Sequence, residues 1–391
     1  MLFTLRQLAE KYAEFGKHLY VCYIDFQKAF DSVWRAGLWT VMRFLGYDEK
    51  LVRLLESLYN GTMSAVRVDG GLTEWFLTVV GVMQGCILSP LLFSVLLEVV
   101  MALALDKCGL GVLVSGTCIS DLRFADDISL LASSESELQQ LVDRVHTTSS
   151  RFGLVVSGAK SEVQCIGRDE LTMNISLGTS SLKQTEHFVY LGGTVSADQS
   201  CDKDIEQRIG LAAGIVRKLG KVWAAKDISR ETKVTLYKTL VQSVVLYNSE
   251  TWTLKQEHKR KLQVFEMAVL RRICGVTRRD RKRNVDIMNA PAIDRDITDL
   301  IQIRRLTYFG HVSRMQPERY PHVLLHGHVT GCRPRGRPRK RWIDNVKEDC
   351  SRLEMTLTDA TTAATNRCQW RRIVRNLGCQ RVETCSSSPR H

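Results

Sequence analysis

Residues 19–25 read LYVCYID, an apolar run of strand-forming residues that stops at the carboxylate Asp25. A run without polar interruption is typical of a central strand buried on both faces. Further along, the apolar segments Ile119–Phe124 and Ile128–Leu131 flank the turn Ala125-Asp126-Asp127. That pattern predicts a hairpin whose turn carries two more carboxylates. These strands predict a sheet in the N-terminal half of the chain.

Helical and extended patterns alternate around this sheet. Ser64–Val68 and Trp75–Val80 predict a hairpin across Gly70-Gly71, because glycine suits a tight turn. Ser89–Leu105 and Glu135–Phe152 have helical spacing of apolar residues. After about residue 195 the spacing is helical only. This order is typical of an α/β or α+β domain followed by a helical one.

The composition is that of a soluble globular protein, with 391 residues of which 44% are hydrophobic and 25% charged. The longest apolar stretch, Leu91–Leu105, contains Glu98 and is too short for a bilayer, so we expect no membrane association. The N-terminus has no signal-peptide pattern, and we therefore expect an intracellular protein. The 12 cysteines include no CxxC pair, so they are interpreted as reduced thiols, and those near the C-terminus match no zinc knuckle.

Charge is distributed unevenly along the chain. The formal net charge of +13 arises from residues 250–391, because basic and acidic residues nearly balance over residues 1–249. A basic region of this kind suits contact with a polyanion, although a solvated basic surface is the alternative reading.

Three carboxylates are candidates for chemistry. Asp25 ends the buried strand, and Asp126 and Asp127 occupy the hairpin turn. Strand ends of one sheet can bring such groups to one point, where like charges repel unless a cation is bound. Oxygen ligands of this type suit two Mg²⁺ ions roughly 3.5–4 Å apart, with Mn²⁺ as a substitute. The residues alone therefore favour a metal-dependent nucleotidyl or phosphoryl transferase.

Several segments resemble the palm motifs of reverse transcriptases, and most closely those of non-LTR (LINE-type) retrotransposons. They are YIDFQKAFDSV (23–33), GVMQGCILSPLLFSV (81–95), FADD (124–127), FGLVVSGAKSE (152–162) and FVYLGG (188–193), in the order of that family. The resemblance implies an α+β fold with a right-hand polymerase palm, an antiparallel sheet with packed helices, over residues 1–195. It also implies a helical thumb over 196–277 and a basic, partly disordered region over 278–391.

The resemblance implies a role for each matching residue. Asp25, Asp126 and Asp127 would be the catalytic metal ligands. Lys160 would protonate the leaving pyrophosphate. Phe30 would exclude a ribose 2′-hydroxyl, while Gln84 and Gly85 would approach the incoming nucleotide. The primer grip would consist of Tyr190, Leu191 and Gly192.

The same resemblance predicts an absence. Fingers that clamp the triphosphate precede the first palm motif in this family, but only a short segment stands before Asp25 here. An N-terminal endonuclease is not found either. We therefore expect a palm and thumb without fingers and endonuclease, whose turnover is reduced because fewer cations face the triphosphate.

Basic clusters mark the C-terminal part. Residues 333–341 contain an AT-hook-like core, in which glycine lets the chain enter a narrow minor groove between arginines. The same residues fit a nuclear-localisation signal or general phosphate contacts. The predicted nucleic-acid-binding residues are Arg278, Arg279, Arg281, Lys282, Arg283, Arg335, Arg337 and Arg339.

The leading hypothesis is an RNA-directed DNA polymerase that uses an RNA template, a DNA primer and deoxynucleoside triphosphates, in the nucleus. The alternative is a non-catalytic nucleic-acid-binding protein derived from a retroelement, in which the palm is only a scaffold. Template-independent nucleotide addition is a third reading. Magnesium dependence and sensitivity to loss of the aspartates distinguish the first from the second.

Overall fold

The structure is a computed structural model that describes residues 1–106, 108–167, 171–289, 293 and 295–377. The chain divides into two compact units. One comprises Met1 and Gly16–Phe188, and the other comprises Leu2–Phe15 and Val189–His391. The palm predicted over residues 1–195 differs from the first unit in two respects: it extends beyond Phe188, and it includes Leu2–Phe15. Among the described helices, none has both the length and the hydropathy needed to cross a membrane.

The first unit is built on a five-stranded sheet with the strand order β13-β10-β1-β9-β8. β1 is the middle strand and runs antiparallel to both β9 and β10, whereas β13 runs parallel to β10. The bounds are β1 Leu19–Ile24, β8 Asp121–Phe124, β9 Asp127–Ala132, β10 Glu162–Ile166 and β13 Lys183–Gln184. The predicted central strand and the hairpin β8–β9 are confirmed.

Helices cover this sheet and form the core of the unit. α5 (Glu135–Arg151) packs on β1 and β9, and α4 (Ser89–Leu105) packs on α5 and on α2 (Arg35–Phe44). Cys22 and Ile24 from β1 join Leu130 from β9 and Leu138 from α5 in this core. α3 (Glu49–Tyr59) and the 3-10 turn η1 (Ala29–Ser32) complete the helical part.

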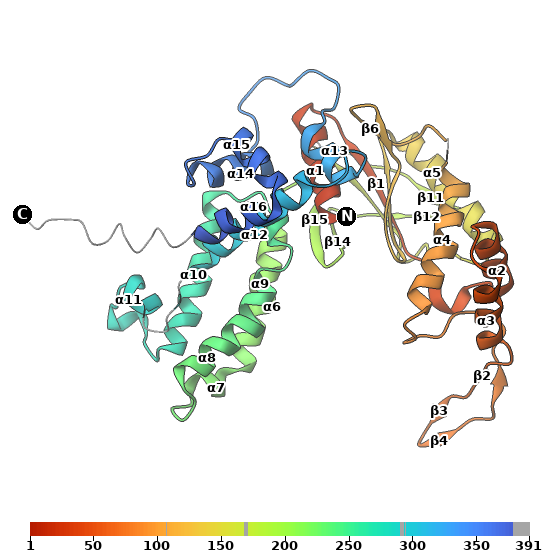
Figure 1. Cartoon of the computed structure of the whole chain (residues 1–391), viewed down its shortest axis with the longest axis horizontal. Coiled ribbons are helices and arrows are strands. Elements are labelled where there is room, and N and C mark those ends of the chain that lie inside the picture. Colours follow the sequence, from red (N-terminus) through yellow and green to blue (C-terminus); the bar gives the residue numbers. More distant parts are fainter. Residues whose placement is uncertain (107, 168–170, 290–292, 294, 378–391) are drawn as a thin grey trace, which may run out of the picture. The chain divides into compact units, whose positions relative to one another are not determined.

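Short hairpins extend from the first unit. The hairpin across Gly70-Gly71, predicted from its glycines, projects beyond α3 (Figure 1). Gly70 has φ 86°, a left-handed conformation that favours glycine. The paired strands are β2 Met63–Ser64 with β5 Phe76–Leu77, β3 Arg67–Val68 with β4 Gly71–Leu72, β6 Val112–Val114 with β7 Thr117–Ile119, and β11 Ser176–Leu177 with β12 Ser180–Ser181.

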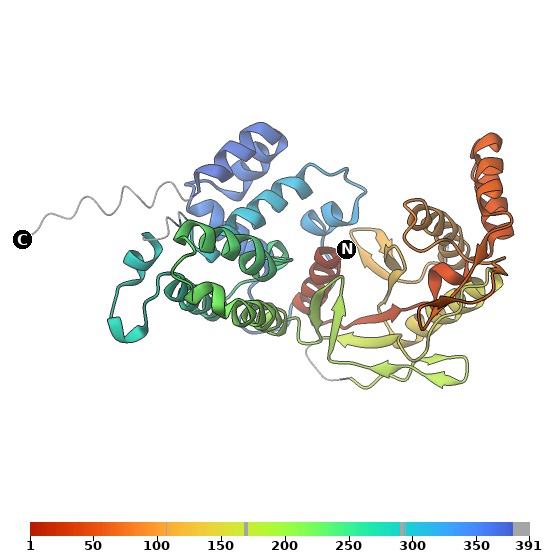
Figure 2. The ribbon, with the colours of Figure 1, turned by 90° about the horizontal axis from the view of Figure 1, so that it is seen from below.

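The second unit is mainly helical. It begins within the hairpin of β14 (His187–Tyr190) and β15 (Gly193–Ser196). His187 and Phe188 of β14 belong to the first unit, and the rest of the hairpin belongs to the second. The helices between residues 202 and 273, green to teal in both views, lie side by side (Figure 1, Figure 2). Its helical elements are α1 Leu2–Glu14, α6 Asp202–Lys218, α7 Gly220–Ala224, α8 Arg230–Leu236, the π-helix η2 Tyr237–Gln242, α9 Ser243–Val245, the 3-10 turns η3 Ser249–Thr251 and η4 Arg278–Asp280, α10 Gln256–Ile273, α11 Asn284–Asn289, α12 Ile297–Ser313, α13 Tyr320–His326, α14 Trp342–Ser351, α15 Leu357–Thr365 and α16 Arg367–Asn376.

Two hydrophobic clusters stabilise this unit. One joins Ile205, Tyr237, Trp252 and Leu270 from α6, η2, the segment after η3, and α10. The other gathers residues of α12, α14, α15 and α16 around the side chain of Phe3. Residues 330–341 contain no helix or strand. The elements before and after them, α12 on one side and α14, α15 and α16 on the other, are helical and share this second cluster.

An antiparallel sheet with packed helices, followed by a helical unit, confirms the predicted α+β class. Trp342 and Trp370 are 0% and 2% exposed, so both indoles belong to the core of the second unit.

Candidate active site

The register of the sheet brings Asp25 to the hairpin that carries Asp126 and Asp127. Ile24, the last residue of β1, pairs with Ile128 of β9, so Asp25 comes next to the start of β9 at Asp127. Phe124 of β8 pairs with Asp127, and Ala125 turns the chain with φ 53°. Two stretches far apart in the sequence thus meet at one sheet edge because their apolar residues pair in this register.

The electrostatics of this edge reflect the crowding of carboxylates. The pKa of Asp127 is raised, first by desolvation and then by the charges of Asp126 and Asp25. Asp25 Oδ1 is buried and accepts no hydrogen bond from the described part of the chain. The carboxylate oxygens of the three residues are not all within 4.8 Å of one another. Like charges at this site repel one another, and a divalent cation bound between them would relieve the repulsion.

The segment from Val156 to Ser161, which leads into β10, contacts Asp25 on the side opposite β9. The Ser157 backbone N–H donates to Asp25 O at 2.7 Å, and the Asp25 N–H donates to Ser161 Oγ at 3.1 Å. Lys160 Nζ lies 3.7 Å from Asp25 Oδ1, and both side chains are substantially exposed. The structure thus brings Lys160 to the aspartate site. Ser161, which is fully buried, was missed by sequence reasoning because a serine in a turn carries no distinctive pattern.

Phe30 and Gln84 come together through a second contact. The Val82 N–H donates to Phe30 O at 2.7 Å, and Gln84 Nε2 donates to Asp31 Oδ1 at 2.9 Å. Phe30 is partly buried, with its ring centroid 5.1 Å from that of Phe93. The predicted substrate-binding segments are therefore adjacent.

Glycines and an arginine hold the loop before Gln84 in place. A Cβ on Gly81 would lie 2.7 Å from Asp31 O, so a side chain there is excluded, and its φ of 83° also favours glycine. Gly85 has the same φ, but a Cβ there would meet no atom within 4 Å. Arg35 donates to Gly81 O at 2.7 Å and to Thr78 O at 2.6 Å. Arg35 was missed because its partners are backbone carbonyls, which a sequence does not reveal.

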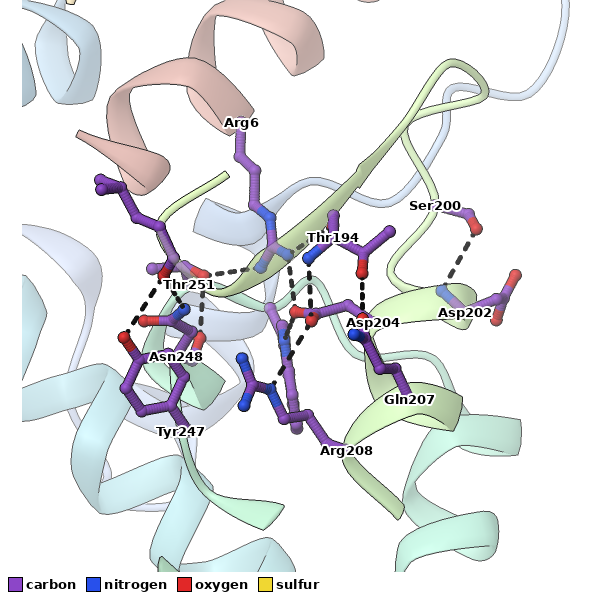
Figure 3. Close-up of polar contacts among 12 residues, drawn as sticks. Arg6, Thr194, Ser200, Asp202, Asp204, Gln207, Arg208, Tyr247, Asn248 and Thr251 are labelled. Carbon is purple, nitrogen blue, oxygen red and sulfur yellow. Dashed lines mark hydrogen bonds and ion pairs between the residues drawn. The ribbon is translucent and has the colours of Figure 1, made fainter. Parts of the chain in front are cut away.

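The predicted primer-grip residues form the turn of the β14–β15 hairpin in the second unit. Tyr190 is 2% exposed, whereas Leu191 and Gly192 adopt φ values of 48° and 72°. Leu191 O accepts hydrogen bonds from Tyr247 Oη at 3.3 Å and from Asn248 Nδ2 at 3.4 Å (Figure 3). The turn is therefore attached to the helical part of the same unit.

A buried carboxylate lies beneath this turn. Asp204 on α6 is 0% exposed and accepts hydrogen bonds from Arg6 Nη2 at 2.7 Å, Trp252 Nε1 at 2.7 Å and the Thr194 backbone N–H at 3.1 Å. Arg208, one helical turn further on, places its guanidinium 4.4 Å from the centroid of the Tyr247 ring (Figure 3). Sequence reasoning missed this network because Arg6 and Asp204 have the spacing of surface residues.

The basic residues fall into different surroundings. Arg278 and Lys282 line a hollow beside α10, whereas Arg283 forms an ion pair with Asp286 at 3.2 Å. Arg279 and Arg281 are exposed near them. In the AT-hook-like segment, Arg335 and Arg337 are exposed and Arg339 donates to Asp198 O at 2.7 Å.

One other group of possible ligands occurs among the described residues. Ligand atoms of Asp202, Glu257 and His258 lie within 4.8 Å of one another. His258 Nε2 is in contact with Asp202 Oδ1, and Lys255 Nζ lies 3.4 Å from Glu257 Oε1. Since the lysine already supplies a positive charge, this group is an ion-pair network.

Comparisons with known proteins agree with the site geometry. Residues 2–195 match the family described as reverse transcriptase (RNA-dependent DNA polymerase). A putative transposon-derived protein of Caenorhabditis elegans is 23% identical over 281 residues, which cover 67% of this chain and 97% of that protein. The RNA-directed DNA polymerase of the mobile element jockey from Drosophila funebris is 23% identical over 269 residues, which cover 68% of this chain and 29% of that protein.

Further similarities are more partial. The Pol polyprotein of an R2 retrotransposable element from Drosophila melanogaster is 30% identical over 189 residues, covering 45% of this chain and 18% of that protein. The chain thus spans less than a third of the jockey and R2 proteins. A telomerase structure from Candida tropicalis is similar with a TM-score of 0.40 and 11% identity, covering 83% of this chain and 51% of that one.

The segment that matches the family, residues 2–195, contains the three aspartates and also Lys160, which lies beside Asp25. The prediction that fingers and endonuclease are absent stays a prediction. Over residues 2–195, this chain belongs to the reverse transcriptase (RNA-dependent DNA polymerase) family, with relatives among non-LTR retrotransposons.

Proposed function

We propose that this chain is the polymerase part of a retrotransposon protein and extends a DNA primer on an RNA template. The observation that carries the proposal is the strand register that brings Asp25 beside Asp126-Asp127. At this site desolvation, and then repulsion from the charges of Asp126 and Asp25, raises the pKa of Asp127. Relief of that repulsion favours divalent cations over monovalent ones, since two positive charges compensate the crowded carboxylates. Magnesium is the proposed ion, with manganese as a substitute.

The chain's own residues have separate roles in this proposal. Asp25, Asp126 and Asp127 would hold the cations, which when bound favour deprotonation of the primer 3′-hydroxyl and neutralise the triphosphate. Lys160 would donate a proton to the leaving pyrophosphate, since its exposed ammonium can turn from Asp25 toward solvent. The ring of Phe30, held against Phe93, would exclude a ribose 2′-hydroxyl.

Primer extension on an RNA template tests the proposal. The full chain is compared with Asp126→Asn, and Asp69→Asn serves as a control with the same charge change. Asp69 is exposed in the β3–β4 turn with φ 47°, a conformation that asparagine tolerates. We expect Asp126→Asn to lower magnesium-dependent incorporation about a hundredfold or more, in the range for removal of a group that stabilises developing charge. Equal incorporation by the two variants would overturn the proposal.

A non-catalytic binding protein is the second candidate. The basic residues that line the α10 hollow and the exposed Arg335 and Arg337 favour it. Such a protein would bind RNA with strong salt dependence, and neither magnesium nor Asp126→Asn would change the affinity. Binding assays with and without magnesium therefore distinguish the two candidates, and nuclear localisation is proposed for both.

A further inference from the structure

A hollow of about 430 Å³ lies beside α10 in the second unit. Its wall combines α10 residues with residues from η4 and the start of α11. Segments separated by the chain reversal after Ile273 thus share one concave surface. A space of this size accommodates a small organic ligand rather than a single inorganic ion.

The hollow is lined by four cations and by no carboxylate: Arg260, Arg271, Arg278 and Lys282. Within the described residues, none of the four forms an ion pair with an acidic side chain. Arg271 is held by Asn284 Oδ1 at 2.7 Å and by Met267 O at 3.3 Å, both neutral acceptors. Asp280 interacts electrostatically with Lys282 but does not line the hollow. The four positive charges in the lining repel one another, and a bound polyanion relieves that repulsion.

The remaining lining residues are not charged. Val264 is 51% exposed and Met267 is nearly buried, so α10 offers an apolar surface inside the hollow. Gln263 and Asn284 add side-chain amides. Gln263 Nε2 donates to Asp296 Oδ2 at 3.4 Å and Asn284 Oδ1 accepts from Arg271, so a ligand would meet the Gln263 carbonyl as an acceptor and the Asn284 NH₂ group as a donor. Cations for a phosphate, an apolar surface for a planar base and amides for its polar edge together match a nucleotide.

We propose that this hollow binds one unpaired nucleotide, with its phosphate on the arginines and its base against Val264 and Met267. A base can enter a concave site only when it is unstacked, so an unpaired nucleotide fits this hollow and a duplex does not. It goes beyond the proposed polymerase activity and needs neither the aspartates nor a metal. The nucleotide can belong to a strand or be free, since both carry the same chemistry.

The structure supplies a matched pair of variants. Arg260→Gln combined with Arg278→Gln removes two cations from the hollow. Arg217→Gln combined with Arg272→Gln removes two exposed arginines of the same unit that lie outside the hollow. The net charge changes equally in both. Binding of a fluorescent single-stranded RNA 12-mer to the full chain is measured without magnesium, and a duplex of the same sequence and free ATP are used as competitors.

We expect the hollow variant to bind the single strand about tenfold more weakly than the control variant, since hydrogen bonds to a charged group are lost. Its plot of log affinity against log salt should be shallower by about 0.7, for the one phosphate of the bound nucleotide. Displacement by ATP would assign the hollow to free nucleotides, and lack of displacement to a strand. Equal affinity of the two variants, or equal losses on single strand and duplex, would overturn the proposal. Polymerase failure with Asp126→Asn affects none of these readouts.

Discussion

Arg6 Nη2 lies 2.7 Å from Asp204 Oδ2, and the carboxylate is fully buried. The ion pair joins α1, which precedes the first palm motif in the sequence, to α6 in the helical unit. The same guanidinium donates to Thr194 O at 3.0 Å and to Thr251 Oγ1 at 2.6 Å (Figure 3). One arginine therefore links α1, the strand after the predicted primer grip and the turn η3. This explains why Leu2–Phe15 belongs to the second unit.

Loss of this ion pair should strongly destabilise the second unit. Asp204→Asn leaves the Arg6 guanidinium partly buried without its counter-charge, and we expect the free energy of unfolding to fall by about 3 kcal/mol. Urea denaturation measures the change. The double variant Arg6→Met with Asp204→Asn should lose less than the sum of the two single variants, because Arg6 is no longer present as a cation without its counter-charge. Arg208, which lies 3.9 Å from Asp204 Oδ1, loses its ion pair equally in the single and the double variant. Additive losses would contradict an interacting pair.

The hydroxyl of Tyr247 should affect the primer rather than stability. Tyr247 is 47% exposed and donates to Leu191 O at 3.3 Å, so Tyr247→Phe removes one contact to the predicted primer-grip turn. We expect the KM for primer to rise about threefold, in keeping with about 0.5–1 kcal/mol for one hydrogen bond, while kcat and the melting temperature stay unchanged. Tyr47→Phe, at an exposed tyrosine of the first unit, is the control. An unchanged primer KM would remove Tyr247 from primer positioning.

The central elements of the first unit could be predicted because their apolar residues pair with regular periodicity. Leu19–Ile24 forms β1 with the predicted bounds, and the Ala125-Asp126 turn follows from two flanking apolar strands. That Asp25 lies beside this turn depends on how β1 and β9 are aligned in the sheet. The resemblance to the family motifs implied that these residues lie together, but apolar periodicity does not give the alignment. The roles of Lys160, Phe30, Gln84 and the primer-grip residues stay predictions.

The C-terminal helices could not be predicted because charged residues occupy their core. Arg305 on α12 is 2% exposed and lies 2.6 Å from Asp349 Oδ2 on α14. A prediction from the periodicity of hydrophobic residues places these two charged residues on the surface. It therefore misses the contact between α12 and α14. The core also requires Phe3, whose ring centroid lies 4.9 Å from that of Trp342. No local pattern connects the two ends of the chain.

Asp127 should make the stability of the metal-free protein depend on pH. Its pKa is raised by desolvation and then by Asp126 and Asp25, so folding disfavours the charged form. Its contribution is fully present below the ordinary aspartate pKa and is lost as pH rises through the raised value. Asp127→Asn should therefore melt at a higher temperature than the unaltered chain at pH 7, and at the same temperature at pH 3. Magnesium should reduce the difference in melting temperature between the two proteins at pH 7. A variant that melts lower at pH 7 would show that the carboxylate is stabilised by a partner.

Glu10 gives a second pH-dependent term, in the helical unit. Its Oε2 accepts a hydrogen bond from the Trp342 backbone N–H at 2.7 Å, so Glu10 caps the first turn of α14 from α1. Burial raises the pKa of Glu10 to about 7, against the lowering by this hydrogen bond and by Arg341. Because the folded pKa is the higher one, stability is fully present below about pH 4.5 and is lost as pH rises through about 7.

Glu10→Gln should remove this dependence, since glutamine keeps an oxygen that can accept from Trp342 but does not titrate. Between pH 5 and pH 8 we expect the free energy of unfolding of the unaltered chain to fall by about 2 kcal/mol more than that of the variant. Burial also raises the pKa of Glu266 to about 7. The free energy of unfolding should therefore keep some dependence on pH in both the unaltered chain and the variant. Urea titrations at several pH values measure the difference between the two slopes. Parallel curves would mean that Glu10 is charged in the folded protein across this range, and the cap would then act through a carboxylate.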